Sequence, residues 1–383
     1  MTPAARWAAA AQIMDQISAG SPAEKALTNW ARQSRFAGSK DRAAIRDHVF
    51  DILRCWRSVA ALSGGETGRH LVLGRLRQTG VDATSVFTGE GYALPPLTPD
   101  ELAAGRPPEG AETADMPDWV FDILWNDLGD KAHSIAEVLR SRASVFLRVN
   151  TLKSDVASAQ AALADALITT RRHPLSETAL EVVENPRRIA QSSAFLSGLV
   201  ELQDVASQAV VEALPLSRGM RVLDYCAGGG GKTLAMAARL AGPVDAYDHN
   251  SGRMADLMPR AERAGAHITC VRLPRGPYDL VLADVPCSGS GSWRRAPEAK
   301  WRLTQTALDA VTKTQAEILD KVAPLVGPSG VLAYATCSVL SCENEHQIKG
   351  FLDRHPDWKC HIQRRFDLQD GGDGFFLAIL TRE

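Results

Sequence analysis

The sequence has no long apolar run, and this absence is the first constraint on the kind of protein it encodes. None of its stretches approaches the roughly 18 consecutive apolar residues of a membrane-spanning helix, so we expect a soluble protein. The first residues, MTPAARWAAAAQIMDQ, lack the basic segment, apolar segment and small-residue cleavage site of a signal peptide. We therefore expect a cytoplasmic protein.

No C-x-x-C pair occurs among the seven cysteines. The absence of this spacing argues against a structural zinc site, and an odd number of cysteines without an export signal argues against a disulfide framework. We expect free thiols and no bound metal. Internal repeats and low-complexity tracts are absent as well.

The chain also lacks a large net charge: 43 Lys or Arg against 45 Asp or Glu give a formal net charge of −2. This balance argues against a generic nucleic-acid coat protein. The charges are unevenly placed, since residues 1–80 hold twelve Lys or Arg against six Asp or Glu, and residues 81–140 hold three against twelve. The basic excess predicts either a surface that meets a phosphate backbone or ordinary solvated helix faces.

The chain is long enough for two or three domains. Residues 1–91 form the first predicted domain, a small helical bundle with a basic exterior. Its third helix is predicted over 39–62, where apolar residues recur at helical spacing: Ile45, Val49, Ile52, Leu53 and Trp56. Six prolines in 92–117 predict a linker over 92–116, and 117–200 read as a helical connector followed by a small α/β subdomain.

From residue 201 to 383, apolar strands alternate with helices. This alternation predicts an α/β domain with a doubly wound, Rossmann-like sheet. In such sheets ligands bind at the carboxyl ends of the strands, so the residues that follow each strand are the candidates for a site.

A glycine loop follows the first strand of this domain, in VLDYCAGGGGKT (222–233). A phosphate-binding loop would need glycine where Cys226 stands, and G-x-G-x-x-G would need a glycine where Thr233 stands. A purely structural turn is a third possibility. Asp248, twenty residues past Gly228, suits a carboxylate that binds ribose hydroxyls, and Asp224 beside a loop without a pyrophosphate pattern favours S-adenosylmethionine over a dinucleotide.

Two later strands end in reactive groups. YDLVLADVPC places Asp284 and Cys287 at one strand end, and GVLAYATCS places Cys337 at another. A lone buried cysteine usually serves packing, but two cysteines and a carboxylate at one edge favour chemistry. A thiolate that adds to carbon 6 of cytosine makes carbon 5 nucleophilic enough to accept a methyl group, and Asp284 at ring nitrogen 3 would stabilise the charge that develops.

The motifs DYCAGGGGKT, DVPCSGSG, KWRL, YATCSVLSCENEHQIK and GDGFF closely resemble those of the Sun/RsmB-like RNA (cytosine-5) methyltransferases. The resemblance covers about 145–383, and SKDRAAIRDHVFDILR looks like the NusB-like RNA-binding domain of the bacterial RsmB branch. It implies that Cys337 is the nucleophile, Cys287 assists product release and Asp284 contacts the target base beside the cofactor. It also implies a cofactor site for S-adenosylmethionine made of Cys226, Ala227, Gly228, Gly229, Gly230, Gly231, Lys232, Asp248, Arg253 and Asp284.

The resemblance implies an RNA substrate, most simply small-subunit (16S) ribosomal RNA, for a monomeric enzyme. Transfer RNA, or an RNA-binding assembly factor with weakened chemistry, are the alternatives. Trp293, Trp301 and the basic residues of 294–302, with the pair Arg171-Arg172, would contact the RNA by stacking and by phosphate binding.

The sequence departs from the family pattern in two places. Gly228-Gly229 replaces Ala-Pro in the glycine loop, which predicts a more flexible loop. No acid follows the strand around HITC until Asp279, although relatives carry one there that meets the adenine.

Overall fold

The computed structural model describes all residues, 1–383, and the chain divides into two compact units. Unit 1 contains Met1–Arg142 and Trp293–Arg302; unit 2 contains Ala143–Ser292 and Leu303–Glu383. The short segment 293–302 therefore belongs to the first unit although it lies late in the sequence. The domain boundaries at 91, 116 and 200 stay a prediction.

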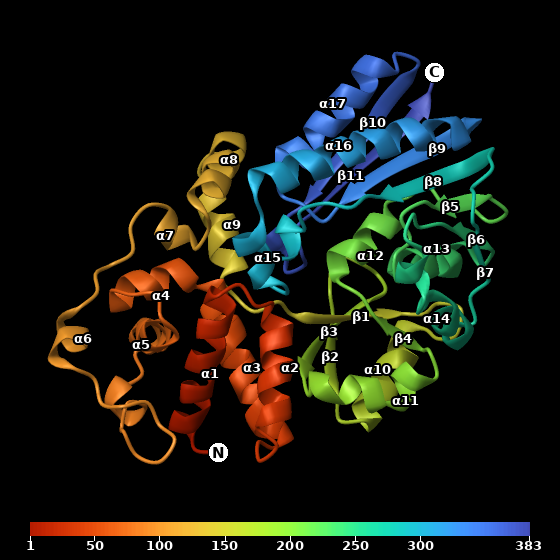
Figure 1. Cartoon of the computed structure of the whole chain (residues 1–383). Helices are drawn as coiled ribbons and strands as arrows, with labels where there is room; N and C mark the ends of the chain where they lie inside the picture. The colour runs from red at the N-terminus through yellow and green to blue at the C-terminus, as the bar shows by residue number, and fades with distance from the viewer. The chain divides into compact units, whose positions relative to one another are not determined.

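Unit 1 is entirely helical, as expected for the N-terminal region (Figure 1). Fully buried apolar side chains from α1, α3 and α5, such as Ile13, Ile52 and Leu71, form its core. Its helices are α1 (Pro3–Ser18), α2 (Ala23–Gln33), α3 (Ser39–Arg54), α4 (Trp56–Ser63), α5 (Gly68–Thr79), α6 (Pro99–Ala103), α7 (Ala111–Ala114), α8 (Asp118–Leu128), α9 (Lys131–Leu139) and α15 (Pro297–Arg302).

The single helix predicted over 39–62 is wrong, because the chain breaks at Cys55 into α3 and α4. A helix end leaves carbonyl groups without intrahelical partners. Here Lys300 Nζ donates to the carbonyl oxygen of Arg54 (2.9 Å) and Trp301 Nε1 donates to that of Leu53 (2.7 Å). Side chains from α15 thus satisfy the break, and no local sequence pattern indicates this.

The proline-rich segment 92–116 contains two short helices, α6 and α7. Thr98 caps α6 and forms a reciprocal capping box with Glu101. Arg69 on α5 forms an ion pair with Glu101 (Nε–Oε1 2.5 Å), and this hydrogen bond is the main cause that lowers the pKa of Glu101 to about 2. The segment is therefore fixed to the bundle by specific contacts.

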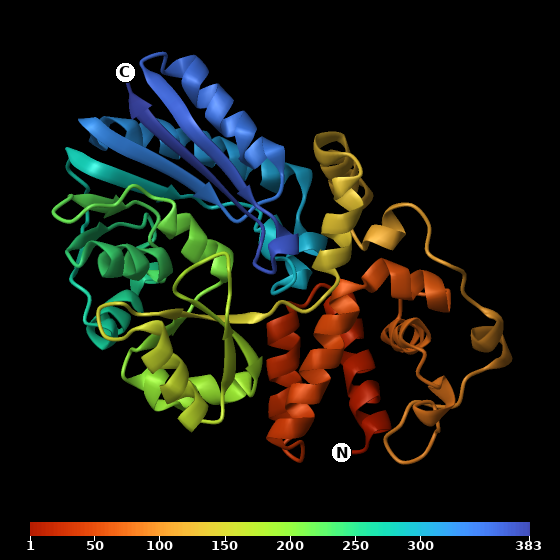
Figure 2. The same ribbon diagram turned by 180° about the vertical axis from the view of Figure 1, so that it is seen from behind.

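Unit 2 begins with a four-stranded antiparallel sheet of order β2-β3-β1-β4. Its strands are β1 (Val145–Val149), β2 (Thr169–Arg172), β3 (Ala179–Glu184) and β4 (Val200–Leu202). Helices α10 (Val156–Asp165) and α11 (Ser193–Leu196) lie beside this sheet (Figure 2). Leu163 and Ala194 of these helices belong to its core. This is the small α/β subdomain predicted from the sequence.

The second sheet of unit 2 has seven strands in the order β10-β11-β9-β8-β5-β6-β7. The strands are β5 (Val222–Asp224), β6 (Val244–Ala246), β7 (Ile268–Cys270), β8 (Tyr278–Asp284), β9 (Val326–Thr336), β10 (Trp358–Phe366) and β11 (Phe375–Arg382). Strands β5 to β9 run parallel, and β11 and β10 add an antiparallel edge. The Rossmann-like fold is thereby confirmed.

Helices cover both faces of this sheet (Figure 1). Alternate strand residues point to opposite faces, so Leu280 and Leu282 of β8 pack with α12 (Val205–Glu212) and α13 (Gly231–Leu240). Val281 and Ala283 pack on the other face with α16 (Gln305–Val322) and α17 (Glu345–Arg354). Helix α14 (Leu257–Ala264) packs against α13 beside β6.

Strand register brings the predicted site residues to one edge of the sheet. Asp224 at the end of β5 pairs with Leu282, and Asp284 at the end of β8 pairs with Ala335. Since the parallel strands end at this edge, the loops after β5, β8 and β9 meet there. The strand order changes direction between β8, β5 and β6, which is where open α/β sheets bind ligands.

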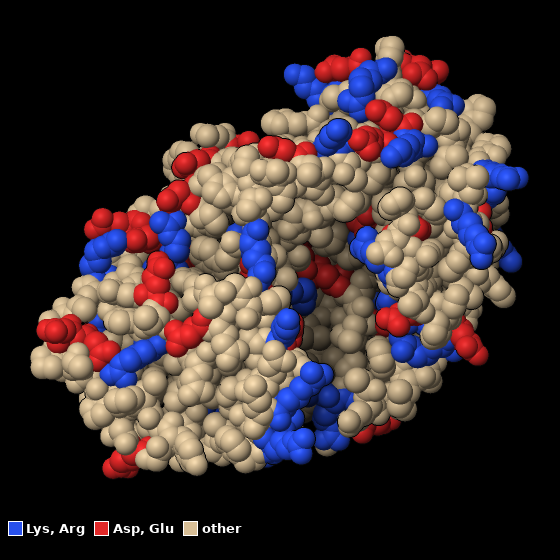
Figure 3. Space-filling view, in the orientation of Figure 1, with Lys and Arg blue, Asp and Glu red and all other residues tan.

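The surface over α16 and α17 carries both signs of charge (Figure 3). Lys321 pairs with Glu317, and Arg354 pairs with Asp320. This face is electrically mixed and forms no basic patch. Among all the helices of the chain, none combines the length and the apolar character needed to cross a membrane.

Candidate active site

One glycine of the loop after β5, Gly230, lies too close to a neighbouring side chain to carry a Cβ. Gly230 has φ +82°, a left-handed conformation that glycine adopts without strain, and a Cβ there would overlap the side chain of Leu257. Gly230 directly precedes α13, so the backbone turns sharply between strand and helix. The loop forms a cradle of main chain at the edge of the sheet.

Asp224 lies under this loop and is fully buried. Thr233 Oγ1 donates to its Oδ2 (2.6 Å), whereas its Oδ1 has no hydrogen-bond partner. Burial raises the pKa of Asp224 to about 7, against the opposing effect of the Thr233 hydrogen bond. A buried oxygen with no donor, at the carboxyl end of a strand, is suited to a ligand that brings a positively charged donor.

Asp248 links the loop to the end of β6. Its Oδ2 accepts the N–H of Gly228 (3.0 Å) and its Oδ1 accepts the N–H of Asn250 (2.9 Å). Arg253 lies 3.4 Å from Oδ2 through Nη1. The carboxylate is thus held in one orientation, with further lone pairs on both oxygens, as a ribose-binding acid requires.

Lys232 and Asp284 form the ion pair at the centre of the site. Lys232 Nζ donates to Asp284 Oδ2 at 2.8 Å and lies 4.7 Å from the ring centroid of Phe375. Burial alone would lower the pKa of Lys232, but the attraction of Asp284 outweighs it and the pKa lies above its ordinary value. A buried ammonium group is thereby kept charged beside the two cysteines.

The thiols of Cys287 and Cys337 are in direct contact, with their sulfur atoms 3.3 Å apart. Both cysteines are free and partly exposed. The hydrogen bond with Cys287 lowers the pKa of Cys337; Lys232 lowers it as well, while burial and Asp284 oppose the shift. The same hydrogen bond, followed by burial, raises the pKa of Cys287 well above its ordinary value. Cys337 is therefore the thiol of the pair that ionises first.

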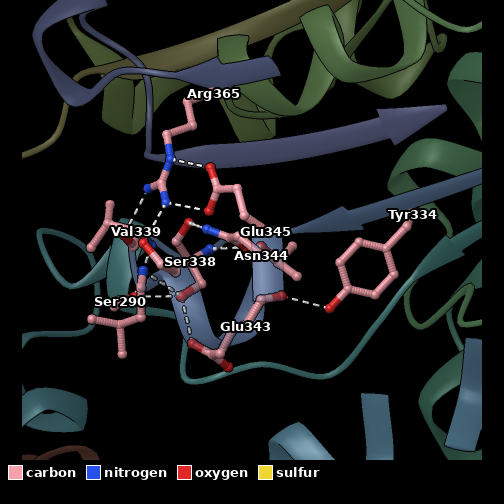
Figure 4. A network of polar contacts seen from close by, with 11 residues as sticks. Ser290, Tyr334, Ser338, Val339, Glu343, Asn344, Glu345 and Arg365 are labelled. Atoms are coloured by element: carbon pink, nitrogen blue, oxygen red, sulfur yellow. Dashed lines mark hydrogen bonds and ion pairs between the residues drawn. The ribbon is translucent and has the colours of Figure 1, made fainter. Parts of the chain in front are cut away.

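The loops that carry the two cysteines are joined by a polar network (Figure 4). Glu343, in a short 3-10 turn (Ser341–Glu343), accepts hydrogen bonds from Ser288 and Ser338, which follow Cys287 and Cys337 in the chain. Ser290 Oγ contacts Ser338 Oγ (2.9 Å) and accepts the N–H of Val339 (3.0 Å).

Arg365 fixes the far side of the Cys337 loop. It donates to the carbonyl oxygen of Val339 (2.8 Å) and pairs with Glu345 through two hydrogen bonds of 2.7 and 2.6 Å. Two main-chain bonds add to this: Gly291 donates to the carbonyl of Cys337, and Gly374 donates to that of Gly291 (both 2.9 Å). The cysteine loops are rigidly connected to each other.

The structure brings together the predicted residues Cys337, Cys287, Asp284 and Lys232, and it places Asp248 and Arg253 at the loop 226–231. It does not offer Trp293 for stacking, because this side chain is 1% exposed, so that expectation is wrong. Trp301 packs against the core of unit 1 and uses its N–H within that unit. Arg171 and Arg172 lie on β2, where Arg171 pairs with Glu181 (2.7 Å).

No acidic residue follows β7 at the edge of the sheet where the glycine loop lies. Strand β7 ends at Cys270, and the next acid, Asp279, lies at the start of β8, where it accepts the N–H of Arg221 (2.7 Å). That carboxylate belongs to the opposite end of the sheet from the glycine loop. No group of three or more His, Cys, Asp or Glu side chains is arranged to hold a metal ion.

Sequence reasoning missed Glu343, Thr233 and Phe375. Glu343 lies in the motif YATCSVLSCENEHQIK, two residues before Glu345. The structure separates them, since Glu343 is fully buried while Glu345 is paired with Arg365 and partly exposed. The sequence motif identifies this segment as part of the site, but it does not distinguish Glu343 from Glu345.

Comparisons with known proteins show to which family the chain is similar. A family model described as 16S rRNA methyltransferase RsmB/F matches residues 211–380, and a model of the RsmF/B-like ferredoxin-like domain matches residues 116–189. The chain belongs to the RsmB/F methyltransferase family. The family's ferredoxin-like model covers β1, β2, β3 and α10 of the small subdomain.

Curated relatives agree with this assignment. The ribosomal RNA small subunit methyltransferase B of Vibrio cholerae is 32% identical over 70% of this chain and 65% of that protein. The protein of the same name from Salmonella arizonae is 33% identical over 70% of this chain and 66% of its own length. The matched region thus spans about two thirds of these relatives.

The crystal structure of PH0851 has the same fold over the whole chain. It superposes with a TM-score of 0.78 and covers 100% of this chain and 99% of its own, at 22% sequence identity. The likeness concerns the fold, including the helical region, the small sheet and the large sheet.

Proposed function

We propose that this protein is an S-adenosylmethionine-dependent RNA cytosine-5 methyltransferase that acts on small-subunit ribosomal RNA. The observation that carries the proposal is the contact between Cys287 and Cys337 at 3.3 Å, beside the ion pair of Lys232 and Asp284. The names of the curated relatives support the ribosomal substrate and the methyl transfer. The cytosine chemistry rests on the two thiols.

The residues around the glycine loop fit S-adenosylmethionine. The unpartnered Oδ1 of Asp224 suits the ammonium group of its methionine part, and Asp248 suits its ribose hydroxyls. Gly228 to Gly231 have no side chains that would occupy the space of the ligand. Cys226 and Ala227 precede them in the same loop, and Arg253 lies beside Gly228. When bound, the cofactor supplies the electrophilic methyl group that carbon 5 of the cytosine accepts.

Cys337 starts the reaction as a thiolate. Its sulfur forms a bond to carbon 6 of the cytosine, and the electrons of the double bond between carbons 5 and 6 move into the ring. The charge that develops at ring nitrogen 3 would be taken up by a proton that Asp284 delivers in its protonated form, and Lys232 would stabilise the carboxylate left behind. Carbon 5 then carries the electron density needed to take a methyl group.

Cys287 acts when the product leaves. After a proton has passed from carbon 5 to water, the bond between Cys337 and carbon 6 breaks and its electron pair returns to the sulfur. The thiol of Cys287 stabilises this thiolate by donating its S–H, as the contact between the two sulfur atoms allows. This is the assistance in release that we assign to Cys287.

An exposed basic surface on α2, the loop that follows it and the start of α3 supports an RNA substrate. Lys25, Arg32, Arg35 and Lys40 are exposed there and form no ion pair, whereas most arginines of unit 1 pair with acids. Phe36, in the middle of this surface, is 71% exposed. Free cations beside an exposed aromatic ring suit the phosphates and unstacked bases of RNA.

Methyl transfer from labelled S-adenosylmethionine tests the proposal. Purified protein is offered 16S ribosomal RNA, assembled small subunits and transfer RNA, and modified cytosines are located by bisulfite sequencing. We expect 5-methylcytosine in the ribosomal RNA and none with Cys337→Ala. Modification of transfer RNA alone would contradict the substrate, and failure to bind S-adenosylmethionine in calorimetry would contradict the enzyme assignment.

Covalent trapping tests the roles of the two thiols. Cys287→Ala should accumulate a protein–RNA adduct that survives denaturing electrophoresis, because release is impaired after attack. Cys337→Ala should form no adduct. An adduct that persisted without Cys337 would show that another group is the nucleophile.

A further inference from the structure

Glu343 is a fully buried carboxylate with no cation in contact. Its Oε1 accepts the N–H of Ser288 (2.7 Å) and the side-chain amide of Gln315 (3.1 Å). Its Oε2 accepts the hydroxyls of Ser288 and Ser338, both at 2.5 Å. Burying a charge without a counter-ion is costly unless its hydrogen bonds are complete. Glu343 meets this condition with four hydrogen bonds, and a buried acid built in this way indicates a specific use.

The partners of Glu343 identify that use. Ser288 directly follows Cys287, and Ser338 directly follows Cys337. One carboxylate therefore bridges the residues next to both thiols, which come from separate loops after β8 and β9. Removing it would leave the loops joined through Ser290 and Gly291 but would take away the link that contacts the residue next to each thiol.

We propose that Glu343 is the positioning residue that holds Cys287 against Cys337 and keeps the two thiols unequal. This inference rests on the proposed function for its catalytic meaning. The bridge fixes the distance of 3.3 Å between the two sulfur atoms, over which one thiol can donate to the other. Glu343 touches neither sulfur and acts through the two serines.

Charge adds to the effect of geometry. Contact with Cys337 and burial are the main causes that raise the pKa of Cys287, and the charge of Glu343 raises it further. Cys337 instead has the ammonium group of Lys232 among its neighbours, which favours its thiolate. The acid and the lysine thus act on different members of the pair.

Thiol labelling tests this inference without RNA or cofactor. Wild type and Glu343→Gln are treated with iodoacetamide between about pH 6 and pH 10, and the rate at each cysteine is read by mass spectrometry. In wild type, Cys337 reacts first. In Glu343→Gln we expect the ratio of Cys287 to Cys337 labelling to rise about tenfold or more, since one pKa unit changes the thiolate fraction about tenfold.

Glu345→Gln is the matched control, because it removes a carboxylate from the same segment without touching Ser288 or Ser338. Its labelling ratio should stay within about twofold of wild type. Methyl transfer by Glu343→Gln should fall on the order of tenfold to a hundredfold in kcat with an unchanged KM for S-adenosylmethionine, as expected for a misplaced reacting group. Glu343→Asp should restore part of the rate.

An unchanged labelling ratio in Glu343→Gln overturns the inference whatever happens to methylation. If Glu343→Gln does not fold by circular dichroism, Ser288→Ala takes its place, since it removes one hydroxyl link and keeps the charge; a ratio equal to wild type then overturns the inference. A wild-type protein that methylates no RNA contradicts the proposed function, while the labelling result still decides the role of Glu343.

Discussion

Two buried lysines, one in each unit, differ in the group that accepts their hydrogen bond. Lys232 in unit 2 and Lys300 in unit 1 each lie 4.7 Å from an aromatic ring centroid, Phe375 and Trp301 respectively. Lys232 donates to the carboxylate of Asp284, whereas Lys300 donates to the main-chain carbonyl of Arg54. Burial lowers the pKa of Lys300 to about 8, but the pKa of Lys232 lies above its ordinary value because Asp284 is in contact.

The difference shows what a buried cation does in each place. A lysine bound by a carbonyl oxygen joins two parts of the main chain, and its charge is a cost that the fold tolerates. A lysine bound by a carboxylate stays charged over the whole physiological range and can act on its neighbours. The first kind stabilises α3 at its end, and the second kind favours the thiolate of Cys337.

The largest effect is expected when the charge of Lys232 is removed. Lys232→Met should slow methyl transfer on the order of a thousandfold, since it removes a charge from the site of proton and thiolate chemistry. The pH midpoint of Cys337 alkylation should move upward. Lys300→Met, a buried lysine exchanged in the same way, should leave that midpoint in place, and a shift there would break the comparison.

A smaller effect concerns stability at alkaline pH. Folded Lys300 loses its proton near pH 8, while the unfolded chain keeps it up to the ordinary 10.5. The unfolded state binds more protons in this window, so the free energy of unfolding should rise with pH between these values. At about 1.4 kcal/mol per pKa unit, the contribution is about 3 kcal/mol.

Urea unfolding of wild type and Lys300→Met at several pH values isolates this contribution, because all other titrating groups are shared. The variant should lack the rise between about pH 8 and 10.5. Parallel curves for the two proteins would mean that Lys300 keeps its charge in the fold, as Lys232 does.

Asp224 is a third buried ionisable group, and its pKa shift can be compared with those of the two lysines. Its pKa of about 7 means that it ionises within the physiological range. If its free Oδ1 receives the cofactor's ammonium group, S-adenosylmethionine should bind about tenfold more tightly at pH 8 than at pH 6. Calorimetry with Asp224→Asn should show weaker binding and no such dependence; an equal pH dependence in this variant would assign the effect elsewhere.

The smallest expected effect comes from the aromatic ring over Lys232. Phe375→Leu removes a cation–π contact, for which about 1 kcal/mol is typical, so methyl transfer should fall about fivefold. The alkylation midpoint of Cys337 should move less than in Lys232→Met. A loss as large as that of Lys232→Met would mean that the ring, and not the ion pair, maintains the charge.

Much of the fold and part of the site could be predicted from the sequence. Strand and helix alternation from residue 201 indicates the doubly wound sheet, and strand ends identify Asp284, Cys287 and Cys337 as neighbours. These predictions depend on local periodicity and on one topological rule. They succeed because β5, β8 and β9 each carry a candidate residue at the strand end or directly after it.

Long-range contacts explain what could not be predicted. The segment 293–302 has the basic and aromatic composition of an RNA-binding stretch, yet Trp293 is buried and Lys300 and Trp301 bind the end of α3. Glu343 and Glu345 are chemically identical and two positions apart, and only the packing of Ser288 and Ser338 distinguishes them. Neither set of contacts can be predicted from the local amino-acid composition.

The place of α15 in unit 1 also has a consequence for synthesis on the ribosome. The carbonyl groups at the end of α3 receive their partners from residues 246 and 248 positions further along the chain. At typical elongation rates this interval corresponds to tens of seconds, during which the N-terminal helices are outside the ribosome with an incomplete hydrogen-bond set. The bundle therefore reaches its final form only after most of the second unit has been translated, so the two units mature together.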